Sequence, residues 1–172
     1  MLPDKRLTCL FVLFLLVGMA PAAWAGAKTE TAKGRTVTRV TKMEVAKVGD
    51  VKGHVMGVIQ RSGLTSFENG EVATYSSTGT FDSTKGKGSH QGYSVRTHED
   101  GSTIVLKWRG THAPGQGGKT TVAEGTFEYV SGTARFEGVE GNGSYSCNRI
   151  VPFAAGGDMY CDFTATLTLP SS

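Results

Sequence analysis

Residues 89–111 read SHQGYSVRTHEDGSTIVLKWRGT, two alternating runs separated by Asp100-Gly101. An Asp-Gly pair between such runs is a strong signal for a two-residue hairpin turn. Counting outward from this turn places Tyr93 opposite Trp108 and makes one face of the hairpin apolar. We expect that face to lie inside the protein and the other face to lie in water. The outer face then collects these side chains: His90, Ser94, Arg96, His98, Lys107 and Arg109.

The same period of two recurs from Arg35 onward, where no window shows the apolar spacing of an amphipathic helix. Clusters of Gly, Asp, Asn or Ser bound eight expected strands, at residues 35–46, 54–61, 71–80, 89–99, 102–111, 120–129, 143–148 and 159–169. This pattern predicts an all-β protein, an eight-stranded antiparallel β-barrel. A sandwich of two sheets is the alternative. The pattern leaves open which face of the first three strands lies inside.

The N-terminal segment predicts a secretory signal peptide. Lys5 and Arg6 precede an apolar run at residues 7–19, and Ala23-Trp24-Ala25 offers small residues where a signal peptidase reads. We expect a signal peptide at residues 1–25, an N-terminal tail at 26–34 and a single barrel domain at 35–172. An uncleaved anchor is the alternative, although the apolar run is short for a bilayer.

The charge of the chain implies no electrostatic partner. It carries 18 Lys and Arg against 15 Asp and Glu, a formal net charge of +3. Nearly equal numbers of basic and acidic residues are not typical of a nucleic-acid-binding protein. We therefore expect a secreted or periplasmic protein without a nucleic-acid partner, and without a membrane partner after signal cleavage.

Two cysteines, Cys147 and Cys161, follow the expected signal peptide. In an oxidising compartment they predict a disulfide, because neither a Cys-x-x-Cys motif nor histidines at ligand spacing accompany them. If the two lie directly opposite each other, Tyr145 meets Phe163 on an apolar inner face. We expect no metal and no cofactor.

The segment VSGTARFEGVEG at residues 130–141, followed by Ile150-Val151-Pro152-Phe153, resembles the allene oxide cyclase barrel family and the related dirigent barrels. The resemblance implies a barrel with Phe136 plugging one end and a cofactor-independent cyclase or isomerase activity. The family's first strand supplies a lumenal glutamate, and Glu44 stands at the matching place. Ala46 stands where the family has an asparagine, and no Ser-Pro pair follows. An exposed strand carboxylate is the other interpretation of Glu44, because burying a carboxylate is costly.

Three functions fit this architecture. The first is an exported barrel that binds a small apolar or aromatic molecule in its lumen. The second is a cyclase or isomerase with Glu44 as its catalytic residue. The third is a structural or interaction barrel whose own side chains fill the lumen. The expected lumen residues are Gln91, Tyr93, Trp108, Phe127, Tyr129, Tyr145 and Phe163.

The state of the lumen discriminates among these functions. An open cavity with a carboxylate pointing into it favours the enzyme, and an open cavity without a carboxylate favours binding. A filled lumen favours the structural role. The outward positions expected for Val105 and Val122 are compatible with a homo-oligomer, although single exposed apolar residues are normal on protein surfaces.

Overall fold

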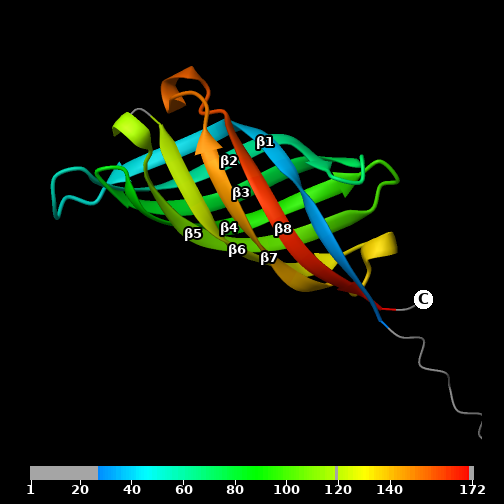
Figure 1. Ribbon diagram of the computed structural model, residues 1–172. Coiled ribbons are helices and arrows are strands. Elements are labelled where there is room, and N and C mark those ends of the chain that lie inside the picture. The colour runs from blue at the N-terminus through cyan, green and yellow to red at the C-terminus, as the bar shows by residue number, and fades with distance from the viewer. Residues whose placement is uncertain (1–26, 119, 171–172) are drawn as a thin grey trace, which may run out of the picture.

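The computed structural model describes residues 27–118 and 120–170, which form a closed barrel of eight antiparallel strands (Figure 1). Each strand pairs with the next along the chain, and the last pairs with the first. The strands are β1 (Lys28–Lys47), β2 (His54–Phe67), β3 (Val72–Thr84), β4 (Lys87–His98), β5 (Thr103–Pro114), β6 (Thr121–Gly132), β7 (Glu140–Arg149) and β8 (Met159–Leu169). The expected eight-stranded antiparallel barrel is confirmed.

The loops between strands alternate between the two ends of the barrel. One end carries the β1–β2 and β3–β4 loops together with the 3-10 turns η1 (Gln116–Gly118) and η3 (Phe153–Ala155), at the left and top of Figure 1. The opposite end carries η2 (Ala134–Phe136) and the end of β8, at the lower right. We call the first the mouth end and the second the closed end.

The first strand is longer than its sequence pattern indicates. It begins at Lys28, so the expected tail at residues 26–34 is corrected to strand for most of its length. This part of β1 lacks apolar alternation, and its backbone is ordered by pairing with β8, from Lys28 opposite Leu169 to Thr38 opposite Met159. The expected signal peptide at residues 1–25 lies outside the described residues. Within the part of the chain that the structure describes, no helix is both long and apolar enough to span a membrane.

The β4–β5 hairpin has a three-residue loop in place of the expected two-residue turn. The His98 amide donates to the Ser102 carbonyl (2.9 Å), and the Gly101 amide donates to the His98 carbonyl (3.0 Å). Gly101 has a φ of 81°, which makes this a type I turn completed by a left-handed glycine. The Asp100 carboxylate accepts a hydrogen bond from the Ser102 amide (3.0 Å) and so favours this longer loop.

The extra loop residue exchanges the two faces of β4. A register change of one residue moves every side chain of a strand to the opposite face. Trp108 on β5 lies inside as expected, but opposite Gly92, while Tyr93 lies outside and is 50% exposed. Four β4 residues expected in water point inward instead: His90, Ser94, Arg96 and His98. Lys107 and Arg109 are exposed, as expected.

The last three strands have the expected faces and register. Cys147 lies opposite Cys161 and forms a disulfide with it, and Tyr145 lies opposite Phe163. On β6, Phe127 and Tyr129 are buried whereas Glu124, Thr126 and Glu128 are exposed. The inner face predicted for this part of the barrel is therefore confirmed.

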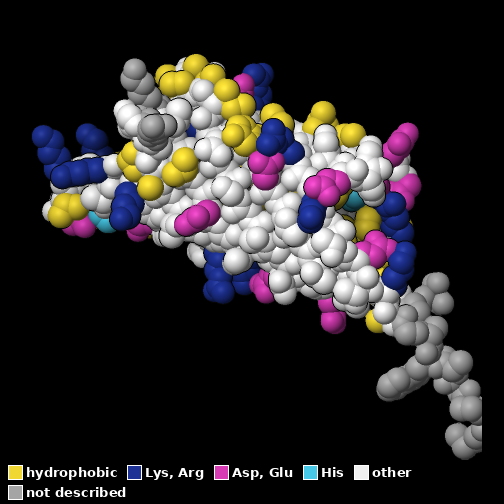
Figure 2. All heavy atoms as spheres, viewed as in Figure 1, with side chains coloured by type: hydrophobic (Ala, Val, Ile, Leu, Met, Phe, Trp, Pro, Cys, Tyr) yellow, Lys and Arg dark blue, Asp and Glu magenta, His cyan; other side chains and the backbone are white. Residues whose placement is uncertain are grey.

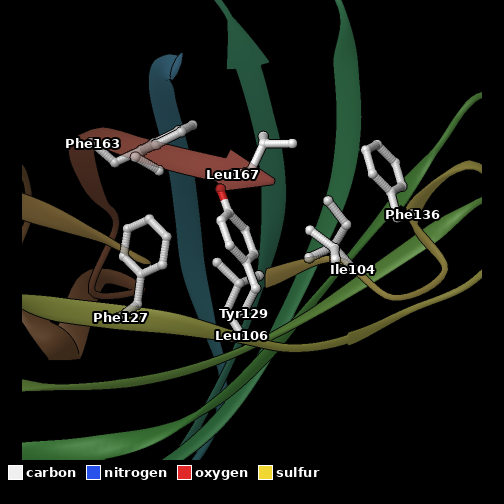
Figure 3. Packing of buried hydrophobic residues seen from close by; sticks show 9 residues of the cluster. Ile104, Leu106, Phe127, Tyr129, Phe136, Phe163 and Leu167 are labelled. Carbon is white, nitrogen blue, oxygen red and sulfur yellow. The ribbon is translucent and has the colours of Figure 1, made fainter. Parts of the chain in front are cut away.

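A core cluster fills the closed end (Figure 3). Phe136 reaches it from η2 and is buried there, as expected for a plug. Phe127 and Phe163 approach each other edge to face, with ring centroids 6.3 Å apart. Full burial of a side chain of this size stabilises a protein by about 1.5–3 kcal/mol. The buried members are Ile104, Leu106, Phe127, Tyr129, Phe136, Val139, Phe163, Ala165 and Leu167.

The outer surface mixes charged and apolar side chains. On the face shown in Figure 2, acidic and basic side chains are interspersed, and hydrophobic side chains gather over η3 at the top. Exposed apolar side chains also occur along β2, β3 and β4, namely Met56, Val58, Leu64, Val72 and Tyr93. These three strands therefore turn several apolar residues outward, whereas the buried core cluster lies on β5, β6 and β8 and around η2.

Candidate functional site

A cavity of about 420 Å³ occupies the lumen between the core cluster and the mouth end. All eight strands contribute to its walls. Met43 and Val45 line it near the mouth end, yet they are 37% and 52% exposed. The lumen is therefore open to solvent at the mouth end, and the core cluster bounds it at the other.

Four of the seven expected lumen residues line this cavity: Trp108, Phe127, Tyr145 and Phe163. Tyr129 points inward too, but it is buried in the core cluster beneath the cavity. Gln91 and Tyr93 are corrected, because the three-residue loop turns both of them to the outside. The aromatic side of the lumen is thus supplied by β5 to β8.

Glycines hold the Trp108 indole against the wall of the barrel. A Cβ atom at Gly79 would lie 2.2 Å from the ring, and one at Gly92 would lie 2.6 Å from it. These contacts are too close for any side chain, so only glycine leaves room for the indole over β3 and β4. The backbone of β3 and β4 therefore fixes the position of the indole ring.

The opposite side of the cavity carries most of its polar side chains, which the alternation in the sequence did not indicate. These polar side chains come from β2, β3 and β4, where Val55, Ile59 and Phe81 also line the cavity: Arg61, Tyr75, Ser77, Ser83, His90, Ser94 and Arg96. The apolar residues of these strands alternate with polar ones, but alternation alone does not say which face is inside. A signal that could have found the site was the run of polar β4 residues, once its turn was identified correctly.

A chain of polar contacts crosses the lumen from β3 to β7. Ser83 Oγ lies 3.0 Å from His112 Nε2, and His112 Nδ1 lies 3.4 Å from His90 Nδ1. His90 Nε2 in turn lies 2.7 Å from Tyr145 Oη. A neutral imidazole offers one donor and one acceptor, so this chain is satisfied without charge. Burial, with His112 and Arg61 nearby, lowers the pKa of His90 to about 4, and burial raises the pKa of Tyr145. Both side chains are therefore neutral at pH 7.

Three arginines line the cavity, while no Asp or Glu is found among its described lining residues. Arg61 donates from Nη1 to the Gly157 carbonyl (3.2 Å), and burial together with Arg149 lowers its pKa to about 10. The Arg149 guanidinium lies 3.5 Å from the centre of the Phe153 ring near the mouth. Arg96 lies against the core cluster. The lumen is therefore positively charged at neutral pH.

Glu44 does not reach the cavity. A bulge in β1 between Val40 and Lys42 shifts the alternation by one residue, so Met43 and Val45 line the cavity and Glu44 points outward. The Glu44 carboxylate pairs with the Lys42 ammonium (2.8 Å), whose hydrogen bond lowers the pKa of Glu44. This position agrees with an exposed strand carboxylate and leaves the implied catalytic role without access to the lumen.

His98 helps to seal the closed end. Its ring packs between Phe67 (centroids 5.5 Å apart) and Phe136 (4.7 Å), and its Nδ1 lies 2.7 Å from the Glu71 carboxylate. Arg135 of η2 pairs with the same carboxylate. These contacts tie η2 to β4 and to the β2–β3 loop, and they close this end of the lumen.

The acidic and histidine side chains at the mouth end form ion pairs rather than a metal centre. His54 Nδ1 lies 2.7 Å from Asp50 Oδ1, and His54 Nε2 lies 2.8 Å from Asp82 Oδ1. Hydrogen bonding to these carboxylates, Asp82 first, raises the pKa of His54. Across the described residues, no group of three or more His, Cys, Asp or Glu side chains is placed to hold a metal ion.

Comparison with known proteins supports the fold. No family model matches the chain, and no curated protein matches it. Among solved structures, the pterocarpan synthase dirigent protein GePTS1 is similar, with a TM-score of 0.51 and 12% sequence identity. The match covers 89% of this chain and 96% of that one. The chain therefore has a dirigent-like barrel fold, in line with the resemblance read from its sequence.

Proposed function

We propose that the protein is an exported binding module whose lumen holds one small apolar or aromatic molecule. The observation that carries this proposal is the open cavity of about 420 Å³, aromatic on one side, with no carboxylate among its described lining residues. Ligand pockets are typically about 300–1,000 Å³ and mostly apolar, with a few polar groups that fix orientation. The size and lining of this cavity fit that description. A purely structural barrel would instead have a lumen filled by its own side chains.

The enzyme alternative would have to use the histidine chain, because Glu44 points outward. A general acid or base works best when its pKa lies near the working pH. Burial moves both members of the closest pair away from that range, since it lowers the pKa of His90 to about 4 and raises the pKa of Tyr145. Binding without chemistry is therefore the function that the lumen supports best.

A blocked lumen tests the proposal. Ala123 and Val122 are neighbours on β6, but Ala123 lines the cavity whereas Val122 is exposed outside. We expect Ala123→Phe to weaken binding of the neutral fluorescent probe N-phenyl-1-naphthylamine at least tenfold. Val122→Phe adds the same ring to the outer surface and should leave the affinity unchanged. The readout is energy transfer from Trp108, measured in a Trp24→Phe background so that Trp108 is the only tryptophan.

The outcomes separate lumen binding from surface binding. Equal loss in both variants, or no loss in either, would place the probe outside the barrel and overturn the proposal. No binding of the probe to the unmodified protein would also overturn it. Near-ultraviolet circular dichroism of each variant checks that the barrel has formed. Mass spectrometry of small molecules that co-purify with the protein would then identify the natural ligand.

Export is supported by two independent features of the chain. A signal-like pattern occupies residues 1–25, and the Cys147–Cys161 disulfide is typical of proteins that mature in an oxidising compartment. We expect protein recovered from the periplasm or the medium to begin at Gly26 when its N-terminus is sequenced. Protein that stays in the cytoplasm with an intact N-terminus would contradict export and leave lumen binding untouched.

A further inference from the structure

Arg96 is a buried cation without an acidic partner. It lies in the middle of β4, is 4% exposed, and points toward the junction of the cavity and the core cluster. Its guanidinium lies over the Phe163 ring, 4.2 Å from the centroid, with the Phe127 ring at 5.9 Å. Among the described residues, none forms a salt bridge with it, and its Nε has no hydrogen-bond partner. The nearby ionisable side chains are the phenols of Tyr75 and Tyr129.

Burying a guanidinium without an acidic partner is energetically unfavourable in the ligand-free protein. Removing a charge from water carries a desolvation cost that cation–π contacts offset only in part. Two other cations near the lumen have conventional partners, since Arg61 donates to the Gly157 carbonyl and Arg135 pairs with Glu71 and Asp100. Arg149 shares with Arg96 an Nε without a hydrogen-bond partner and lies over the Phe153 ring, but it is only partly buried, near the mouth. Among the described arginines that line the cavity, Arg96 is the one that is buried with ring faces as its partners.

We propose that Arg96 is the anion-recognition group of the lumen, and that the ligand is a small apolar molecule carrying one carboxylate or sulfonate group. This inference rests on the proposed function and specifies the ligand's chemistry. The anionic group lies against the Arg96 guanidinium at the bottom of the cavity. The apolar body extends toward the mouth, between Trp108 and Tyr145 on one side and the serines of β3 on the other.

The charge of the lumen supports the same ligand class. Arg61 and Arg149 line the path from the mouth to Arg96, and no carboxylate is found among the described lining residues to compete for them. A cleft lined by one sign of charge concentrates ligands of the opposite sign. A guanidinium offers several N–H donors in a planar fork that matches a carboxylate or sulfonate. An anion would therefore satisfy the donors that the protein leaves free.

Two probes that differ by a single anionic group test the inference. 1-Anilinonaphthalene-8-sulfonate and N-phenyl-1-naphthylamine share the same ring systems, but only the first carries a sulfonate. We expect the unmodified protein to bind the sulfonate at least tenfold more tightly. Arg96→Met should abolish that preference, so that the ratio of the two affinities falls to about one. Arg109→Met is the matched control, because Arg109 on β5 is exposed outside and the preference should persist.

Each outcome decides one of the two proposals. If both probes bind equally to the unmodified protein, the anion site is refuted while lumen binding stands. If neither binds, the proposed function itself fails. If Arg96→Met and Arg109→Met weaken the sulfonate equally, the effect is one of net charge and the inference is refuted.

A second measurement covers the case in which Arg96→Met fails to fold. In the unmodified protein, the Arg96 Nε–H resonance should shift when the sulfonate is added and stay in place when the neutral probe is added. A resonance that stays in place with both probes overturns the inference.

Discussion

Two walls of the same barrel face the lumen with different chemistry. The wall formed by β5 to β8 turns mainly aromatic and aliphatic side chains inward, together with His112 and Arg149, and carries the disulfide. The wall formed by β2 to β4 turns arginine, histidine and serine inward beside a few apolar residues, and leaves Met56, Val58 and Leu64 exposed. The apolar wall supplies most of the buried hydrophobic contact, whereas the polar wall supplies groups that can recognise a ligand.

This division places stability and recognition on different strands. Every buried member of the core cluster lies on β5 to β8 or in the η2 loop between β6 and β7. On the polar wall, hydrogen bonds such as Thr36 Oγ1 to Thr65 Oγ1 (2.9 Å) satisfy some groups and leave Arg96 free. Substitutions on the two walls should therefore have different consequences.

The largest effect is expected from truncation on the apolar wall. Phe127 is buried among Tyr129 and Phe163, so Phe127→Ala should lower the free energy of unfolding by about 3–5 kcal/mol. Tyr93→Ala removes a ring of similar size from the outer face of β4 and should change it by less than about 0.5 kcal/mol. Urea unfolding of both variants measures the difference. Similar losses would contradict the burial of Phe127 in the core and the exposure of Tyr93 on the outer surface.

The disulfide adds a second contribution to the apolar wall. It closes the loop between Cys147 and Cys161, a sequence separation of 14, and a loop of this length is stabilised by about 3 kcal/mol in the chain-entropy model. Replacing both cysteines with alanine should lower stability by about that amount without abolishing the fold. The denaturant midpoint and the circular dichroism spectrum check both statements. Two alkylatable thiols in the denatured, unreduced parent protein would show that the bond does not form.

The polar wall should make stability depend on pH. The pKa of His90 is about 4 in the folded protein and about 6.5 in the unfolded chain, so between these values the unfolded state binds the additional proton. The contribution of His90 is fully present above pH 6.5 and is lost as the pH falls toward 4. At about 1.4 kcal/mol per pKa unit, and after allowance for partial exposure, the loss is roughly 2 kcal/mol. Below pH 4 it should not grow further.

His90→Gln isolates this contribution from the other titrating groups. The stability difference between the parent and His90→Gln should shrink as the pH is lowered from 7 to 4, when unfolding is followed at each pH. A constant difference over that range would show that His90 titrates normally, which would contradict its position in the lumen.

The smallest effect is expected at Glu44, outside both walls. Its carboxylate is exposed, and among the described residues it forms one ion pair, with Lys42 on the surface, so Glu44→Gln should change neither the denaturant midpoint nor probe binding. An NMR titration should find the pKa of Glu44 lowered, not raised. A raised pKa of Glu44, or a loss of probe binding in Glu44→Gln, would indicate that the Glu44 side chain points into the lumen.

The inner face of the apolar wall was predictable from sequence, because large apolar residues alternate there with polar ones and only the apolar set can be buried. Phe127, Tyr129, Phe163 and Leu167 are large and apolar, and apart from Val130 their neighbours on the same strands are Thr, Asp and Glu. Cys147 and Cys161 fixed the register between β7 and β8 independently. Pattern and pairing agreed there, and the structure has the same register.

The inner faces of β1 and β4 were not predictable, for two local reasons. Asp-Gly favours a two-residue turn, but the bond from the Ser102 amide to Asp100 stabilises a loop one residue longer, which reverses β4. The bulge after Val40 reverses the second half of β1 in the same way. Neither shift changes composition or periodicity, so both become visible only when the strands are paired in three dimensions.

The indole N–H resonance of Trp108 tests the central claim most directly, because the ring lies in the lumen between the two walls and its Nε1 has no hydrogen-bond partner among the described residues. In Trp24→Phe protein the 15N spectrum contains one indole signal. We predict that 1-anilinonaphthalene-8-sulfonate shifts this signal and that the shift saturates at one equivalent, while the backbone amides of Tyr93 and Val58 on the outer surface stay in place. A static indole signal with shifting outer amides would show that the ligand binds outside the barrel and would contradict the account.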